Sequence, residues 1–181
     1  MSSKSKALTS GIALVPWEIA MHEGKSYMVN WLRGAEIDMV IKGMVQDLCE
    51  ELGEQLVSVA VYGSHARGTA TPRSDIDLLV VMEGLSRDWG SIHRLEDEWV
   101  RKGRRLGKRF QVMLASPEDV KDSVEWVAPL MLEIFNNHKI VFDRDDFFRS
   151  CIIRMGALVK ERGIRMRRPG VWEVPEHAVS P

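Results

Sequence analysis

The chain has 181 residues, 45% of them hydrophobic, which is enough for one compact core and predicts a single main domain. Its 25 Lys and Arg residues nearly balance its 26 Asp and Glu residues, so no global positive field favours bulk nucleic-acid binding. Two distant cysteines without a C-x-x-C pair argue against a disulfide framework or a cysteine zinc site. We find no membrane-spanning run and no signal peptide, and therefore expect a reduced, cytoplasmic protein with no membrane partner.

Two short extended runs, 12–21 and 26–31, flank a turn-like segment and indicate a hairpin near the N-terminus. A helix is predicted over 35–52, since apolar residues recur there at i, i+3 and i+4 and Gly53 then ends the helix. The recurring residues are Ile37, Val40, Ile41, Met44, Val45, Leu48 and Leu52. A core-facing helix is the ordinary explanation of such a stripe.

Further strands and helices alternate along the chain. Strands are predicted at 56–62, 75–82, 110–115 and 139–142. Helices are predicted at 88–105, 124–136 and 146–162, and another begins at Ser116, which is followed by a proline and then by a carboxylate at the third position. The tail carries Pro169-Gly170 between short apolar runs, which favours a second hairpin.

These patterns predict an α+β fold, a small mixed β-sheet with helices mainly on one face. We divide the chain into an N-terminal extension at 1–34, a main domain at 35–163 and a C-terminal tail at 164–181. The two added ends could serve as dimer contacts that make a homo-oligomer, as a partner surface or as a substrate wall.

The chemistry is concentrated in residues 61–82. Gly63-Ser64 directly follows a predicted strand, and glycine allows the backbone to approach a ligand while N–H groups at a helix start can seat phosphate oxygens. Asp75 follows eleven residues after Ser64, and Asp77 lies two residues further, so both carboxylates share one face of the next strand. Such a pair suits Mg²⁺ together with substrate phosphates, and it can hold one ion or bridge two.

These residues resemble a known family signature. The run Gly63-Ser64-x-Ala66-Arg67-Gly68, followed by Ser74-Asp75-x-Asp77-Leu78, is similar to that of the DNA polymerase beta-like nucleotidyltransferase superfamily, and most of all to its minimal nucleotidyltransferases. The resemblance is specific over 55–82, and the order of elements is consistent to about residue 160.

The resemblance implies the nucleotidyltransferase fold and a Mg²⁺-dependent reaction. A nucleoside monophosphate, expected to be AMP from ATP, would pass from an NTP to an acceptor hydroxyl and release pyrophosphate. Gly63 and Ser64 would hold the triphosphate, Arg67 would contact phosphates, and Ser74 would brace the loop before the two metal-binding and catalytic residues, Asp75 and Asp77. Some family members are antitoxins that modify a tyrosine of a partner toxin, so the acceptor could be a partner protein.

One position departs from the family pattern. Active members carry a third carboxylate on a later strand, and by register this position falls on Gln111, an amide that cannot act as a general base and binds Mg²⁺ weakly. Either a water or another carboxylate takes the proton, or the domain is a catalytically degenerate module that binds nucleotide or a partner. Glu133 is the best outside carboxylate, although a solvated helix residue is the simpler explanation of it.

Two other functions are weaker on the sequence. His65 next to Ser64 would need a third, orienting group to make a hydrolase, and adjacent residues rarely face each other. Basic clusters at 101–109 and 162–168, the second close to Trp172, could bind nucleic acid, although we favour solvated faces.

Overall fold

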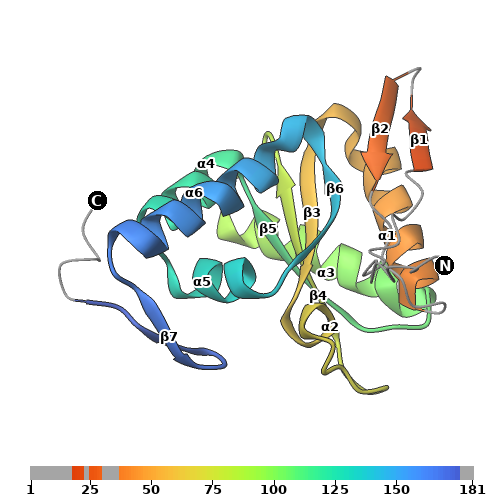
Figure 1. Cartoon of the computed structure of the whole chain (residues 1–181). Helices are drawn as coiled ribbons and strands as arrows, with labels where there is room; N and C mark the ends of the chain where they lie inside the picture. The colour runs from red at the N-terminus through yellow and green to blue at the C-terminus, as the bar shows by residue number, and fades with distance from the viewer. Residues whose placement is uncertain (1–17, 23–24, 30–36, 176–181) are drawn as a thin grey trace, which may run out of the picture.

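The computed structural model describes residues 18–22, 25–29 and 37–175 (Figure 1). The strands are β1 (Glu18–His22), β2 (Lys25–Val29), β3 (Leu56–Tyr62), β4 (Ile76–Met82), β5 (Phe110–Ala115), β6 (Lys139–Asp143), β7 (Arg165–Arg168) and β8 (Val171–Glu173). The helices are α1 (Ile37–Leu52), α2 (Gly63–Arg67), α3 (Trp89–Arg105), α4 (Pro117–Glu125), α5 (Pro129–Asn136) and α6 (Phe147–Glu161), with short 3-10 turns at Gly53–Gln55 and Arg144–Asp146.

The central sheet has four strands in the order β5-β4-β3-β6. Strand β4 pairs antiparallel with β3 and parallel with β5, and β3 pairs antiparallel with β6, so the sheet is mixed as the sequence predicts. All seven residues of β3 are buried, as are six of the seven in β4. Strands buried on both faces read as continuous apolar runs, which is why these two lack the alternation of a half-exposed strand.

Helices cover both faces of this sheet, which corrects the prediction that they lie mainly on one face. Figure 1 shows α1 and α3 on one side of the strands and α4, α5 and α6 on the other. Two separate apolar clusters correspond to these layers, one with α1 and α3 and one with α4, α5 and α6. The physical reason is that β3 and β4 present apolar side chains on both faces, and each face must be covered. The α+β class itself is confirmed.

The helix predicted from the first apolar stripe packs as expected. Ile41, Met44, Val45 and Leu48 of α1 are each no more than 2% exposed, and they share a cluster with the fully buried Trp99 of α3. Burying each such side chain contributes about 1.5–3 kcal/mol. This layer therefore holds the strands that carry the acidic residues.

The predicted element boundaries hold closely, with two corrections. The second strand begins at Ile76 instead of Asp75, and the helix predicted over 124–136 divides into the end of α4 and all of α5. Pro129 lacks the N–H of a helix interior and fits a first helical turn, so a new helix begins there. The start of α4 has the expected cap, in which Ser116 and Asp119 each accept the other's backbone N–H.

Both predicted terminal hairpins form in the described residues. Strand β1 pairs antiparallel with β2, and β7 pairs antiparallel with β8. Strand β2 also contacts β6 of the central sheet. Residues 12–17 and 30–31 of the first predicted hairpin lie outside the described residues, and the division into three segments stays a prediction. No described helix combines the length and the apolar character that a membrane crossing requires.

Candidate active site

A sharp bend joins β3 to the short helix α2. Tyr62 ends the strand in an extended conformation, and Gly63 follows with a φ of +64°, a region that residues with a Cβ rarely adopt. The helix then ends at Gly68, whose left-handed backbone lets its N–H bond to the carbonyl of Ser64. The glycine-serine pair therefore begins a turn of helix at the end of a buried strand.

The Asp77 carboxylate lies against this bend. Tyr62 and Asp77 are paired residues of β3 and β4, and a Cβ built on Gly63 would overlap Oδ2 of Asp77. The positive φ therefore favours glycine, and a residue with a Cβ would also displace the Asp77 carboxylate from the bend. The structure thus brings together the two halves of the motif, which are separated by more than ten residues in the sequence.

The two aspartates lie close enough to interact. Asp75 directly precedes β4 and Asp77 is its second residue, so both project from one face of the strand end. Burial raises the pKa of Asp77, and the negative charge of Asp75 raises it further, while His65 and Arg67 lower it. Ionised together, the two carboxylates repel each other, which a cation between them would relieve.

The connecting loop is braced by its own side chains. Ser74 Oγ accepts the backbone N–H of Thr71 at 2.9 Å, and the Ser74 N–H donates to the Thr71 carbonyl at 3.0 Å. Arg109, from the residue before β5, donates to the Arg73 carbonyl at 3.2 Å. This arrangement agrees with the supporting position expected for Ser74.

Arg109 is a site residue that the sequence analysis did not single out. Its Nε lies 2.7 Å from Oδ1 of Asp75, so the two side chains form an ion pair. Oδ1 of Asp75 accepts no hydrogen bond of good geometry from Arg109 or from any other described residue. A cavity of about 340 Å³ opens beside it, lined in part by Arg73 and Lys108. The available signal was a basic residue two positions before the third-carboxylate position. The structure therefore places positive charge beside Asp75.

Gln111 occupies the expected register. In the parallel pairing of β4 with β5, Asp77 lies opposite Gln111, and the Gln111 side chain is exposed. Gln111, the residue opposite Asp77 on the adjacent strand, thus carries an amide at the position where the signature that this chain resembles has a carboxylate.

Glu133 forms an ion pair with the short helix α2 that follows the bend. Its carboxylate accepts a hydrogen bond from Arg67, and its side chain is 28% exposed. The pair joins α5 to α2, so the expectation of a simple solvated position is corrected, because tertiary packing brings two distant helices together. Arg67 divides its charge between this partner and Asp77.

His65 does not form a hydrolase arrangement with Ser64. Its Nε2 is buried without a hydrogen-bond partner among the described residues, so no third group orients the ring.

The donor set at the strand end fits a magnesium ion. Asp75 and Asp77 supply hard carboxylate oxygens, and no cluster of three or more His, Cys, Asp or Glu ligands occurs in the described parts of the chain. Mg²⁺ is usually held by one or two carboxylates together with waters and substrate phosphates, so a pair of carboxylates is a sufficient set of protein ligands.

Comparison with known proteins shows the family to which the chain belongs. Residues 41–126 match the family described as "Nucleotidyltransferase domain". The chain is also 30% identical over 125 residues to "Putative protein adenylyltransferase MJ1305" of Methanocaldococcus jannaschii, and the match covers 68% of this chain and 84% of that protein.

Solved structures give more distant matches. A toxin–antitoxin complex with AMP-PNP matches at 17% identity, covering 67% of this chain and 92% of the other with a TM-score of 0.44. A tri-AMPylated HEPN toxin of Shewanella oneidensis in complex with an MNT antitoxin matches at 12% identity, covering 69% and 92% with a TM-score of 0.43.

Proposed function

Because this chain belongs to the nucleotidyltransferase family, we propose that it is a Mg²⁺-dependent adenylyltransferase that transfers AMP from ATP to a hydroxyl of a partner protein. The observation that carries the proposal is the contact of the Asp77 carboxylate with Gly63, which joins an acidic pair to a phosphate-binding bend. The choice of AMP and of a protein acceptor is supported by the name of the relative from Methanocaldococcus jannaschii.

Each site residue has a definite task under this proposal. The backbone of Gly63 and the Ser64 hydroxyl hold the triphosphate, and Arg67 adds positive charge beside it. Asp75 and Asp77 hold one or two Mg²⁺ ions, while Ser74 keeps the preceding loop in place. A bound divalent cation supplies charge neutralisation on the phosphates and makes the acceptor hydroxyl more acidic.

The reaction forms a bond between the acceptor oxygen and the α-phosphorus and breaks the bond from that phosphorus to the bridging oxygen of pyrophosphate. The chain acts mainly by positioning and by electrostatics. Gln111 cannot take the acceptor's proton, so the proton passes to water at the exposed edge beside it. The reduced cysteines and the need for ATP favour the cytoplasm as its place of action.

The test measures AMP and pyrophosphate formed from labelled ATP, with water as a slow acceptor, together with calorimetry of ATP binding. We expect Mg²⁺-dependent binding and turnover in the wild type, and a fall of about 1000-fold in turnover when Asp75→Asn and Asp77→Asn are combined. Equal metal-dependent ATP affinity in the double variant would contradict the site.

Gln111 favours a second candidate, a degenerate module that binds nucleotide and a partner without turnover. The variant Gln111→Asp distinguishes the two, because it restores the third carboxylate. Turnover in the variant alone supports the degenerate module, and turnover in both proteins supports the enzyme.

A further inference from the structure

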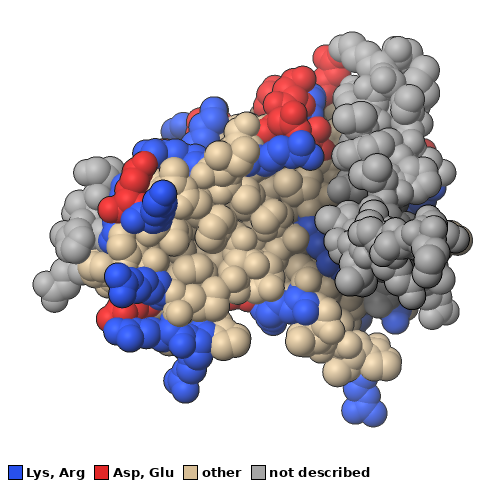
Figure 2. Space-filling model, viewed as in Figure 1, with Lys and Arg blue, Asp and Glu red and all other residues tan. Residues whose placement is uncertain are grey.

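The β7–β8 hairpin is a basic element outside the part of the chain that matches the nucleotidyltransferase domain. Residues 160–175 contain five Lys and Arg residues against two Glu residues, although the whole chain has a net charge of −1. Every residue of β7 is exposed. Figure 2 shows the blue side chains of this region gathered at the lower left, with few red ones among them.

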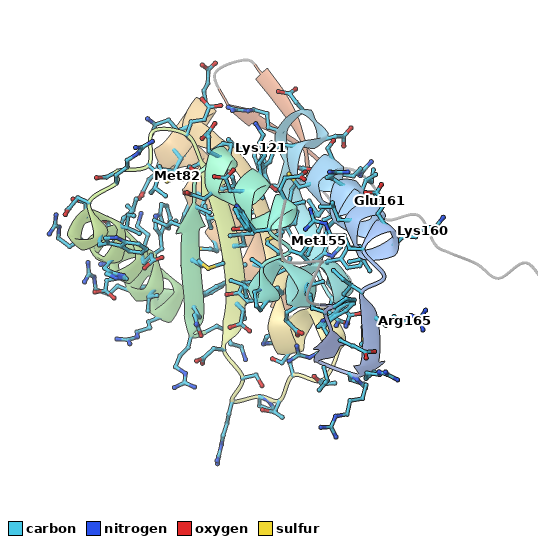
Figure 3. The ribbon with its side chains drawn as sticks, turned by 90° about the vertical axis from the view of Figure 1, so that its left-hand side faces the viewer. Met82, Lys121, Met155, Lys160, Glu161 and Arg165 are labelled. Atoms are coloured by element: carbon cyan, nitrogen blue, oxygen red, sulfur yellow. The ribbon has the colours of Figure 1, made fainter. Side chains whose placement is uncertain are left out.

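One ion pair and one packed tryptophan hold the hairpin in place, and they do not use all of its arginines. Arg167 forms a two-point ion pair with Glu173, at 2.6 and 2.8 Å, across the two strands. Trp172, paired with Met166, packs against the apolar cluster of α4, α5 and α6. Arg168 has no ion pair within the described part of the chain, and Figure 3 shows Lys160 and Arg165 directed away from the body on one side.

The hairpin lies at the same end of the molecule as the candidate site. Figures 1 and 3, which are related by a quarter turn, both place it at the lower end with α2. Helix α5 connects the two regions, because Glu133 of α5 pairs with Arg67 of α2 and other α5 residues belong to the cluster that anchors Trp172. The arginines of the hairpin therefore lie at the same end of the molecule as the bend.

From this placement we infer that the β7–β8 hairpin binds an acidic segment of the protein that receives AMP, and so guides the acceptor hydroxyl to the site. This inference rests on the proposed function. Opposite charge across an interface speeds encounter and selects the partner. An element added outside the shared domain is suited to recognise the acceptor, since the nucleotide contacts belong to the domain itself.

The surface favours a protein over a nucleic acid. Single-stranded nucleic acids use exposed aromatic rings as stacking platforms, but the aromatic residue of this hairpin, Trp172, is packed against the core. The apolar residues exposed beside the arginines are aliphatic: Met166 is 37% exposed and Val171 is 41% exposed. Arg and Met are both enriched at protein–protein interfaces.

The experiment uses the full chain and a fluorescent random copolymer of glutamate and tyrosine, whose binding is followed by anisotropy without any need for turnover. We expect the combined change Arg165→Glu and Arg168→Glu to weaken binding about ten-fold and to leave Mg²⁺-dependent ATP binding intact. A matched change of charge on α3, Arg101→Glu with Arg104→Glu, should leave copolymer binding close to that of the wild type.

Three results would overturn the inference: no copolymer binding by the wild type, equal binding by the hairpin variant, or displacement of the copolymer by an oligonucleotide of equal length that binds more tightly. The variant with Asp75→Asn and Asp77→Asn separates this test from the proposed function. It should bind the copolymer normally while losing metal-dependent ATP binding, so failure of either idea is seen without the other.

Discussion

The two ends of the central strands differ in how they treat charge. At the end away from the bend, Arg144 pairs with Glu83 at 2.6 Å and also donates to the Glu54 carbonyl. Asp143 at the same end accepts the backbone N–H groups of Phe148 and Arg149, at 2.9 and 3.0 Å, and so caps α6. Burial raises the pKa of Asp143 while these N–H groups lower it, so the charges at this end are stabilised by groups of the chain itself.

At the bend, by contrast, two carboxylates lie close enough to repel each other. Arg109 pairs with Asp75 in a half-exposed position, and the pKa of Asp77 is raised by burial and by Asp75. A pair of like charges is unfavourable without a counter-ion. The comparison teaches that one end of the sheet pairs its charges within the chain, whereas the other keeps two like charges together, as the proposed cation site requires.

Among the single changes that test this comparison, the largest effect is expected from Gly63→Ala. The added Cβ overlaps the Asp77 carboxylate at a backbone position with a positive φ, so the carboxylate must shift from its place beside the bend and activity should fall by at least about 100-fold. The measurement is AMP formation from labelled ATP. The matched control is Gly68→Ala, which has a φ of +74° but nothing within 4 Å of the new Cβ. It should lose about 1 kcal/mol of stability and keep most of its activity; equal activity losses would refute the steric argument.

The next effect concerns the opposite end. Arg144→Gln removes an ion pair and a hydrogen bond from a side chain that is only 23% exposed, and should lower the free energy of unfolding by about 1–2 kcal/mol. Urea unfolding measures this change. Arg149→Gln is the control, because its nitrogen lies 3.5 Å from Asp146 and both side chains are well exposed, so its effect should stay within about 0.5 kcal/mol.

A smaller effect is expected from Arg109→Gln. The change removes the guanidinium group that pairs with Asp75 and would repel a metal ion there. The affinity for Mg²⁺, measured by calorimetry, should therefore rise by about 5-fold. Lys108→Gln makes the same change of charge one residue away and should have less effect. If the Arg109 variant bound Mg²⁺ more weakly than this control, Arg109 would be supporting the metal site instead of competing with the metal.

The smallest effect is a gain in stability. Because the folded-state pKa of Asp77 lies above its ordinary value of 3.8, its ionisation opposes folding; this cost grows as pH rises from about 3.8 to the folded-state pKa and stays constant above it. In the presence of EDTA, Asp77→Asn should therefore raise Tm by about 1–2 °C at pH 8, and the gain should shrink as pH falls toward 4. Added Mg²⁺ should raise the Tm of the wild type but not that of the Asp77→Asn variant. A lower Tm in the variant at pH 8 would show that Asp77 is satisfied without a cation.

Local patterns in the chain were enough to predict much of this protein. Continuous apolar runs correctly predicted β3 and β5 to the residue, and the i, i+3, i+4 stripe predicted the buried face of α1. Pro129 was the visible reason for a helix boundary that the prediction still missed. The Gly63-Ser64 and Asp75-x-Asp77 motif was readable because its geometry depends on a strand end and an i, i+2 spacing, both of which are short-range properties.

Long-range packing alone produced the remaining features. Arg109 meets Asp75 across 34 residues of chain, and Glu133 meets Arg67 across 66. The helices on the second face of the sheet, and the seat of Trp172 on them, depend in the same way on how layers assemble. Such contacts have no local signal, because residues far apart in the chain meet only when the hydrophobic faces of several elements are buried together, and many pairings satisfy the same periodicity.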